Sequence, residues 1–439
     1  MKFPGATSHR VFGSLLIGTV VHLATPVPAA NWPGWRGGVD GSGIAAEQHA
    51  PVEWSAAKNV RWKVALPNRG NSTPIVWGDR VFVTQVVEAE NFRTLMCFDR
   101  GDGKLLWQKG VTYTKPERTH KTNPYCSASP ATDGERVVVT FASAGVYCYD
   151  FNGKELWKKD LGPQDHEWGN SSSPVIHGDI CYVYHGPGDD AFLVALNKKD
   201  GRELWRYQEP PVKPGPRTDG FRDAREVIDG SFSTPIIVKA NGRDELIMSF
   251  PQEVRALDPK TGQVLWHCAG LNPLIYTSPI YGDGVVVAMG GFLGTTIAVK
   301  AGGNGDVTGT HRLWIQERTK NRLGSGVIHN GHIYILNTDG IAECLELKTG
   351  KTLWEERLRG TGPRSESWSS MTLVSDRIYI PNQFGDTLVL RASPKFELLA
   401  TNPVKEPTNS SLVLSNGEFF LRTHNSLWCI SEVKSASSQ

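Results

Sequence analysis

The fold is decided by one recurring stretch, Ala256-Leu257-Asp258-Pro259-Lys260-Thr261-Gly262-Gln263-Val264-Leu265-Trp266. The frame opens on a small residue, passes through a polar turn that contains glycine, and closes on tryptophan. Further copies occupy residues 97–107, 148–157, 195–205, 298–314 and 344–354. Self-similarity of this kind indicates one structural unit repeated along the chain.

A second signature alternates with the first. It is a Ser-Pro or Thr-Pro pair, followed by a turn and a run of β-branched and aromatic residues such as Ile333-Tyr334-Ile335. Such runs, bounded by Gly-Asp, Asn-Gly or Ser-Asp turns, predict strands joined by hairpins. The copies begin at Thr73-Pro74, Ser129-Pro130, Ser173-Pro174, Thr234-Pro235 and Ser278-Pro279, with degenerate copies at Ser325-Gly326, Ser369-Ser370 and Ser410-Ser411.

The spacing of the two signatures predicts a closed ring. The frame ends stand mostly 40 to 50 residues apart, which is the length of a four-stranded propeller blade. The chain opens with an orphan end strand at residues 60–64, around Trp62, and closes at Trp428-Cys429-Ile430. We therefore expect the first strand to complete the last blade, because closure removes exposed sheet edges. The prediction is an all-β, eight-bladed propeller of four-stranded blades. Seven blades is the alternative, because the copy near Leu398 lacks the tryptophan.

Composition excludes several classes of protein. The net charge of +2, from 47 Lys and Arg against 45 Asp and Glu, predicts no binding of nucleic acid. No window of about 20 apolar residues exists, so no transmembrane segment is expected in the mature chain. Of the seven cysteines, four (Cys97, Cys148, Cys344 and Cys429) hold the small position of the frame. We expect them to be small buried side chains, with disulfides as the alternative.

Residues 1–30 have the pattern of a cleaved secretory signal peptide. Lys2 and Arg10 precede an apolar stretch, and small residues near Ala30 offer a cleavage site. A short membrane anchor is the alternative. No cysteine lies near the cut, so a lipoprotein anchor is not expected. The predicted organisation is a signal peptide (1–30), a lead-in segment (31–54), a propeller (55–432) and a disordered tail (433–439) in a periplasmic or secreted protein.

The frame Ala-x-Asp-x-x-Thr-Gly-x-x-x-Trp resembles the tryptophan-docking repeat of pyrroloquinoline-quinone (PQQ) propellers. That superfamily includes quinoprotein alcohol dehydrogenases and the propeller component of the outer-membrane protein assembly machinery. The resemblance covers about residues 55–431 and implies the fold; it does not fix the activity. Propellers with Trp-Asp dipeptides are excluded, because none of the 14 Trp is followed by Asp. The opening Trp32-Pro33-Gly34-Trp35-Arg36-Gly37 is similar to the start of exported PQQ-like repeat proteins without an assigned activity.

Polar loops that join each tryptophan strand to the next Ser-Pro strand are expected around a central funnel. Arginines, carboxylates and tryptophans there suit an anionic or planar ligand, although loops are also polar simply because they are solvated. The resemblance implies PQQ, with Ca²⁺ beside it held by carboxylate and amide oxygens. The candidates for binding the cofactor are Trp168, Trp368, Arg225, Arg364, Glu366 and His166, and those for the metal are Glu167, Asn170 and Asp229.

Two functions remain open. The first is an exported, non-catalytic binding or scaffold module that presents its funnel face to a protein partner or a small ligand. The second is a PQQ-dependent dehydrogenase that oxidises an alcohol or sugar in the periplasm. Dehydrogenases of similar fold stack the quinone on a disulfide of neighbouring cysteines, and no two cysteines are adjacent here. That absence favours the binding module.

Overall fold

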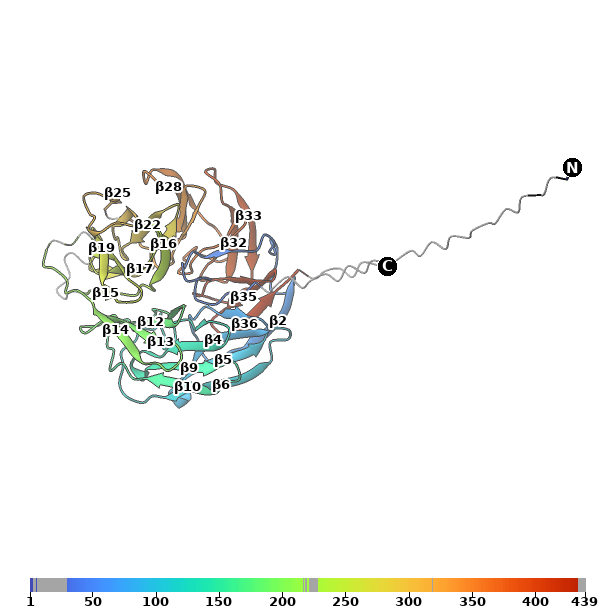
Figure 1. The fold of residues 1–439 in the computed structure, drawn as a ribbon, viewed down its shortest axis with the longest axis horizontal. Helices are drawn as coiled ribbons and strands as arrows, with labels where there is room; N and C mark the ends of the chain where they lie inside the picture. Colours follow the sequence, from blue (N-terminus) through green and yellow to red (C-terminus); the bar gives the residue numbers. More distant parts are fainter. Residues whose placement is uncertain are drawn as a thin grey trace.

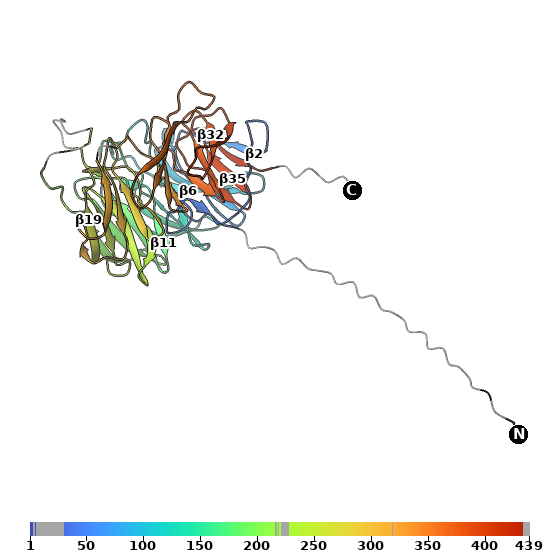
Figure 2. The same cartoon turned by 90° about the horizontal axis from the view of Figure 1, so that it is seen from above.

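A ring of four-stranded antiparallel blades makes up the fold (Figure 1). The computed structural model describes residues 1–2, 5, 30–215, 217, 219–220, 228–317 and 319–432. In the view turned by 90° the strands run through the thickness of the ring, and loops gather at its two faces (Figure 2). The predicted eight-bladed propeller is confirmed, and the seven-bladed alternative is wrong.

The first four blades follow chain order from the inner to the outer strand. Their strands are β3 (Ile75–Trp77), β4 (Arg80–Val87), β5 (Phe92–Asp99) and β6 (Leu105–Thr112); β7 (Ala131–Thr132), β8 (Arg136–Thr140), β9 (Val146–Asp150) and β10 (Glu155–Lys159); β11 (Val175–His177), β12 (Ile180–His185), β13 (Phe192–Asn197) and β14 (Glu203–Gln208); β16 (Ile236–Ala240), β17 (Arg243–Phe250), β18 (Glu253–Leu257) and β19 (Val264–Ala269).

The last four blades repeat the arrangement, and the eighth takes its outer strand from the start of the chain. Their strands are β21 (Ile280–Gly282), β22 (Val285–Met289), β23 (Thr296–Lys300) and β25 (Arg312–Gln316); β26 (Val327–His329), β27 (His332–Leu336), β28 (Ile341–Glu346) and β29 (Thr352–Arg357); β30 (Thr372–Val374), β31 (Arg377–Pro381), β32 (Asp386–Arg391) and β33 (Leu398–Pro403); β34 (Val413–Ser415), β35 (Glu418–Arg422), β36 (Ser426–Ile430) and β2 (Val60–Ala65). Smaller elements are β1 (Ile44–Ala45), β15 (Gly230–Ser231), β20 (Leu274–Ile275), β24 (Gly305–Asp306), η1 (Glu88–Glu90) and η2 (Ala142–Ala144).

Strand β2 closes the ring as predicted. It pairs antiparallel with β36, placing Trp62 opposite Cys429 and Val64 opposite Leu427. In Figure 1 the blue β2 lies beside the red β36. The eighth blade therefore combines both ends of the propeller, and β2 covers the edge that β36 would otherwise expose.

A belt of serine and threonine hydroxyls explains the second sequence signature. At the head of each inner strand, a backbone N–H donates a hydrogen bond to the hydroxyl of the equivalent residue in the next blade. The series returns to its start when Ser411 donates to Thr73. The eight bonds run Thr73 to Ser129 (2.9 Å), Ser129 to Ser173 (3.0 Å), Ser173 to Thr234 (3.0 Å), Thr234 to Ser278 (2.8 Å), Ser278 to Ser325 (3.2 Å), Ser325 to Ser370 (2.9 Å), Ser370 to Ser411 (3.0 Å) and Ser411 to Thr73 (3.1 Å).

The tryptophans of the frame connect the blades at the rim. Six indole N–H groups donate to a hairpin carbonyl oxygen of the following blade. The hairpin residue beneath the indole has no room for a side chain. An added Cβ at Gly262, whose φ is +72°, would lie 2.6 Å from the Trp205 ring. The bonds run from Trp62 to Arg100 (2.8 Å), Trp107 to Phe151 (2.9 Å), Trp157 to Lys198 (2.9 Å), Trp205 to Pro259 (3.0 Å), Trp314 to Leu347 (2.9 Å) and Trp354 to Ser393 (3.0 Å).

Trp266 departs from the predicted docking onto a hairpin carbonyl. Its fully buried indole N–H donates instead to the Glu245 carboxylate of its own blade, at 2.8 Å. The reason is the Gly-rich insert that replaces the short hairpin of blade 5. The backbone N–H of Gly302 in that insert donates to the same carboxylate at 3.3 Å, and β24 pairs with β19 beside Trp266.

Blade 7 has no frame tryptophan, and Trp54 from the lead-in segment supplies the ring instead. Trp54 is buried and stacks on Tyr379 of β31, with ring centroids 6.2 Å apart and planes at 16°. Tyr182, at the equivalent strand position, lies 5.9 Å from Trp205 with the ring planes tilted at 44°. A docking tryptophan has no hairpin to cover in blade 8, because there the two chain ends meet. The missing tryptophan near Leu398 is therefore a consequence of ring closure.

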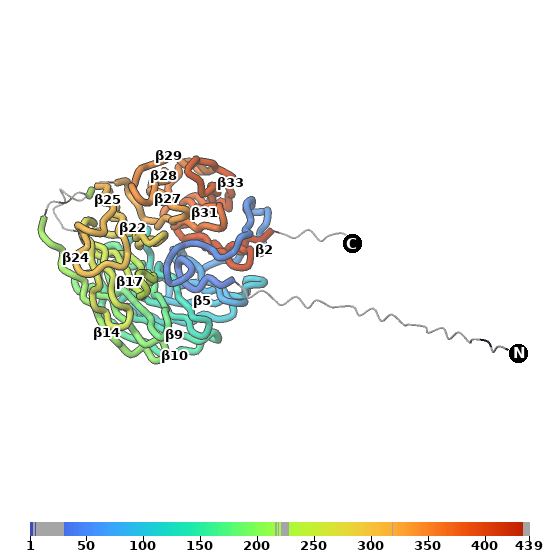
Figure 3. Tube along the Cα trace, turned by 45° about the horizontal axis from the view of Figure 1, so that its top comes forward, coloured from blue at the N-terminus to red at the C-terminus, as the bar shows by residue number. Residues whose placement is uncertain are grey.

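The rest of the lead-in segment, residues 31–54, folds over the centre of the ring (Figure 3). Trp32 bridges Val76 of blade 1, and β1 pairs in parallel with β30 of blade 7. Between them the buried Arg36 donates hydrogen bonds to five backbone carbonyls, of Gly41 (2.8 Å), Ser42 (2.9 Å), Gly326 (2.6 Å), Ser325 (3.1 Å) and Met371 (3.3 Å). The lead-in is thus built into the propeller.

The cysteines fit the prediction for the small position of the frame. All seven are free and buried, including Cys97, Cys148, Cys344 and Cys429. Burial raises the pKa of the Cys97 thiol to about 12. Among the described residues, no helix is long and apolar enough to cross a membrane. Most of the predicted signal peptide and the whole predicted tail, 433–439, lie outside the described residues.

Candidate functional site

A cavity of about 530 Å³ lies at the centre of the ring, on the face where outer strands connect to the next inner strand. Its size falls in the range of small-molecule sites, roughly 300–1,000 Å³. The belt forms its lower wall through Thr73, Ser129, Ser173, Thr234, Ser370 and Ser411. Trp35 of the lead-in segment also lines it.

A second tier of side chains lies above the belt and follows a simple rule. In every blade the residue two positions before the belt residue lines the cavity, because alternate residues of an extended chain point to the same side. The second tier consists, from blade 1 to blade 8, of Asn71, Ser127, Ser171, Phe232, Tyr276, Leu323, Trp368 and Asn409.

The second tier has a polar half and an apolar half. Blades 8, 1, 2 and 3 contribute two asparagines and two serines, and blades 4 to 7 contribute Phe232, Tyr276, Leu323 and Trp368. Loops add His120, Asn123 and Trp168 on one side and Phe292 and Asn321 on the other. None of the described residues that line the cavity is Asp, Glu, Lys or Arg.

Aromatic contacts order the wall near blades 3 to 5. Trp168 lies 6.0 Å from Tyr276, and Phe232 also lies 6.0 Å from Tyr276. His166 packs edge-on against both Trp168 (5.9 Å) and Phe232 (5.4 Å). These edge contacts hold the Trp168 side chain where it lines the cavity.

His166 supports this wall as a neutral ring. Burial is the main cause that lowers its pKa. Its Nδ1 accepts a hydrogen bond from the Trp168 backbone N–H at 3.2 Å, so the ring proton is on Nε2, which donates to the Asp229 carbonyl oxygen at 3.2 Å. The imidazole therefore positions the Trp168 loop and brings no charge to the cavity.

Asparagine side chains hold the polar half in place. Asn71 donates to the Thr122 carbonyl oxygen at 2.8 Å, and Asn123 donates to the Trp168 carbonyl oxygen at 2.7 Å. The side-chain oxygen of Asn409 accepts a hydrogen bond from the Gln383 amide at 2.8 Å. The Asn409 amide nitrogen donates to the side-chain oxygen of Asn71 at 3.4 Å. Each amide retains further donor or acceptor capacity beyond these bonds.

The predicted cofactor-binding residues separate into two groups. Trp168 and Trp368 line the cavity, and His166 packs behind Trp168. Arg364 and Glu366 do not line it: they pair with each other at 3.1 Å, and the Arg364 side chain is 73% exposed. Arg225 lies outside the described residues. Binding of a cofactor by these side chains stays a prediction.

Two of the three predicted metal ligands have defined surroundings in the structure. The Asn170 amide donates to the Gly186 carbonyl oxygen at 2.6 Å, and burial raises the pKa of the Asp229 carboxyl. In the part of the chain that the structure describes, no group of three or more His, Cys, Asp or Glu could hold a metal ion. A metal-binding role for Glu167, Asn170 and Asp229 stays a prediction.

A calcium-bound quinone does not fit the described lining. Ca²⁺ takes carboxylate oxygens, and the carboxylates of PQQ need cationic partners. The described lining offers amides, hydroxyls and aromatic rings but neither kind of charge. The aromatic faces alone fit a planar or ring-shaped ligand.

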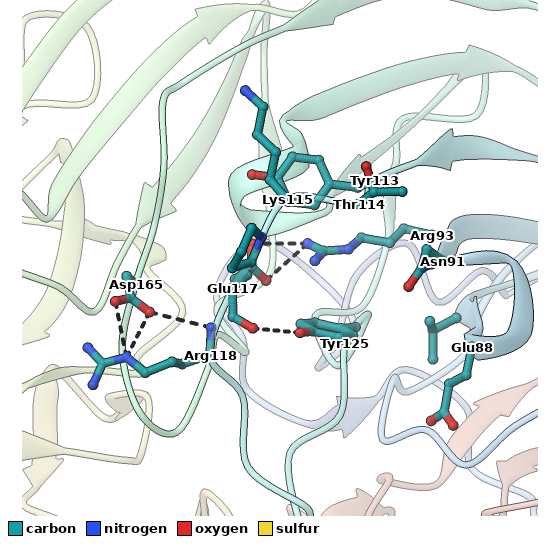
Figure 4. A pocket seen from close by; sticks show the side chains of 12 residues that line it. Glu88, Asn91, Arg93, Tyr113, Thr114, Lys115, Glu117, Arg118, Tyr125 and Asp165 are labelled. Atoms are coloured by element: carbon teal, nitrogen blue, oxygen red, sulfur yellow. Dashed lines mark hydrogen bonds and ion pairs between the residues drawn. The ribbon is translucent and has the colours of Figure 1, made fainter.

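A second pocket, of about 480 Å³, lies between blades 1 and 2 (Figure 4). Its buried Arg93 pairs with Glu117 at 3.0 Å and is held between the rings of Tyr113 (4.7 Å) and Tyr125 (4.3 Å). Arg118 pairs with Asp165 in the same pocket, at 2.9 Å. The four charged side chains form two ion pairs with each other. We therefore interpret these contacts as anchors for the loops that line the pocket.

Sequence reasoning missed Trp35, Phe232, Phe292 and the belt. A usable signal existed for Phe232, which stands two residues before Thr234, as Trp368 does before Ser370. No such rule covers Trp35, because the lead-in segment lies outside the repeat.

Comparison with known proteins places the chain in a family. Two overlapping matches, residues 34–119 and 91–356, fit the family described as outer membrane protein assembly factor BamB. The chain belongs to this family. The PQQ-like repeat propeller of this family agrees with the resemblance that the eleven-residue frame shows.

The relatives of this family member carry different names. They include a tetrathionate hydrolase of Acidithiobacillus ferrooxidans (24% identical, over 60% of this chain and 40% of the relative) and a polyvinylalcohol dehydrogenase of Pseudomonas sp (23%, over 56% and 41%). A third is the outer membrane protein assembly factor BamB of Yersinia pestis (21%, over 62% and 64%). The chain thus spans about two fifths to under two thirds of the length of these relatives.

Solved structures agree on the fold. BamB of Moraxella catarrhalis superposes with a TM-score of 0.59 at 14% identity, covering 86% of this chain and 98% of that one. A quinohemoprotein alcohol dehydrogenase of Comamonas testosteroni gives 0.66 at 12% identity, covering 93% and 82%. Similarity at this level shows the propeller and no activity.

Proposed function

We propose that the protein is exported and acts without catalysis, as a propeller that binds a small ligand in its central cavity. The observation that carries this is the lining: about 530 Å³ surrounded by aromatic rings, amides and hydroxyls, with no charged residue among the described ones. A concave site of this size with a few convergent polar groups suits a small ligand better than a protein surface.

The competing function is a PQQ-dependent dehydrogenase. The name of the polyvinylalcohol dehydrogenase relative and the fold of the quinohemoprotein enzyme speak for it. Against it stands the absence of a carboxylate or guanidinium from the described lining, which leaves calcium and the quinone carboxylates without partners. The same lining disfavours tetrathionate, which is a dianion.

A turnover assay separates the two functions. The purified protein is incubated with excess PQQ and Ca²⁺, and oxidation of primary alcohols and aldoses is followed by reduction of a dye. We expect no dye reduction above that of a protein-free sample. Turnover that disappears in the Trp368→Ala or Glu167→Gln variant would contradict the proposal and establish the dehydrogenase.

A further inference from the structure

We infer that the central cavity binds an uncharged pyranose oligosaccharide; this assignment rests on the proposed function and names its ligand class. The observation that carries it is the division of the second tier into an aromatic half and a polar half that face each other across one cavity. A pyranose ring has the same division, with C–H groups on its faces and hydroxyls around its edge.

The apolar half offers platforms for the sugar faces. Tyr276 and Trp368 belong to it, and Trp168 contacts Tyr276 at 6.0 Å from the loop before blade 3. The half-buried Trp368 keeps its ring toward the cavity. Aromatic rings bury 150–250 Å² each, so stacking on them is the main source of affinity for a ligand without charge.

The polar half and the belt supply hydrogen bonds for the hydroxyls. Each belt hydroxyl already accepts one backbone N–H, and an accepting hydroxyl still has a proton to donate. Among the described contacts, the Ser325 hydroxyl is the belt member that donates within the protein, to the Ser278 carbonyl oxygen at 3.3 Å. The other belt hydroxyls that line the cavity can therefore donate to a sugar, beside the amides of Asn71 and Asn409.

The described lining holds no Asp, Glu, Lys or Arg, and this lack of charge determines the class of sugar. Burying a carboxylate without a cation or several donors is costly, so an acidic sugar would lose its hydration without replacement. A neutral sugar loses only the hydration of its hydroxyls, and the cavity can replace that hydration with hydrogen bonds. The assignment therefore predicts discrimination between neutral and acidic trisaccharides of similar size.

The test is calorimetric titration of the purified full-length protein with neutral trisaccharides (maltotriose, cellotriose, mannotriose and xylotriose) and with trigalacturonic acid. We expect at least one neutral trisaccharide to bind with a dissociation constant below about 1 mM, and trigalacturonic acid to bind at least about tenfold more weakly. Trp368→Ala should weaken binding about tenfold, and Trp368→Phe should restore most of it. Asn71→Ala should weaken binding about fivefold through the polar half.

Lys158→Ala is the control, because this side chain of β10 is 65% exposed and does not line the cavity, and its binding should equal that of the wild type. Failure of all four neutral trisaccharides, or binding that Trp368→Ala and Asn71→Ala leave unchanged, would overturn the assignment. If that failure comes without PQQ-dependent dye reduction, the ligand class alone is wrong. If dye reduction occurs, the proposed function itself is wrong.

Discussion

At the scale of the residue, Arg36 shows how the lead-in segment is fixed to the ring. The residue is 3% exposed, and its guanidinium lies among carbonyl oxygens of the lead-in itself and of blades 6 and 7. Burial lowers its pKa to about 10, so the side chain is still charged at neutral pH. A planar group with five N–H donors is the side chain best suited to satisfy several carbonyls at once.

Arg36→Met should destabilise the protein by about 3 kcal/mol, because buried carbonyls of the two blades lose their donors. Denaturant unfolding measures this directly. Arg364→Met is the matched control; its side chain is 73% exposed, so a change within about 0.5 kcal/mol is expected. Equal effects of the two substitutions would mean that Arg36 does not tie the lead-in to the ring.

At the scale of the element, β2 is the strand on which closure depends. It contributes the Trp62 indole to the docking contact with Arg100 of blade 1 and the whole outer edge of blade 8. Without it, β36 would become an exposed edge and one contact between neighbouring blades would be lost.

Deletion of residues 55–65 should lower the melting temperature by about 10 °C or more, because the ring opens. A synthetic peptide of the same eleven residues, added in excess, should restore part of the loss by pairing with β36. Calorimetric melting with and without the peptide gives the comparison. An unchanged melting temperature after deletion would refute the closure argument.

At the scale of the whole molecule, acid should weaken the fold through the half-buried His424. Burial, followed by the nearby Arg69 and Arg422, lowers the pKa of His424 to about 4 from its ordinary 6.5. Between these two values the unfolded chain binds a proton that the folded chain does not, so this histidine costs stability as the pH falls. Glu209 acts in the opposite direction, since burial raises its pKa to about 7.

The contribution of His424 is therefore measured as the difference in the free energy of unfolding between a variant and the wild type. His424→Gln removes the titrating group, so the stability of the variant relative to the wild type should increase as the pH falls from about 6.5 to about 4, and then level off. Denaturant unfolding at several pH values measures both proteins. A difference that does not change with pH would show that His424 titrates alike in the folded and unfolded chains.

The sequence predicted the scaffold well because propeller physics repeats in every blade. The frame, the Ser-Pro signature and the offset strand at Trp62 are local patterns, and each appears in the structure as expected. Trp54 could not be placed, because it substitutes for a missing tryptophan from outside the repeat. Trp266 differed because an insert about 35 residues later replaces the hairpin it would cover.

The candidate site was predicted only in part. The sequence points to Trp168 and Trp368 because large aromatic residues in loops are conspicuous, but the same loop pattern also indicates Arg364 and Glu366. A loop pattern does not show which neighbouring side chain points inward, and these two pair with each other and do not line the cavity. The residue two positions before each belt residue is the one that lines the cavity. This rule becomes visible only in the structure.

We propose that this propeller retains the family scaffold and binds an uncharged ligand in a cavity whose described lining holds no Asp, Glu, Lys or Arg. Equilibrium dialysis of the purified protein against micromolar PQQ, with and without Ca²⁺, tests it most directly. We expect equal concentrations of PQQ on both sides of the membrane under both conditions. Retention of PQQ by the protein that requires Ca²⁺ and is lost in the Trp368→Ala variant would contradict it.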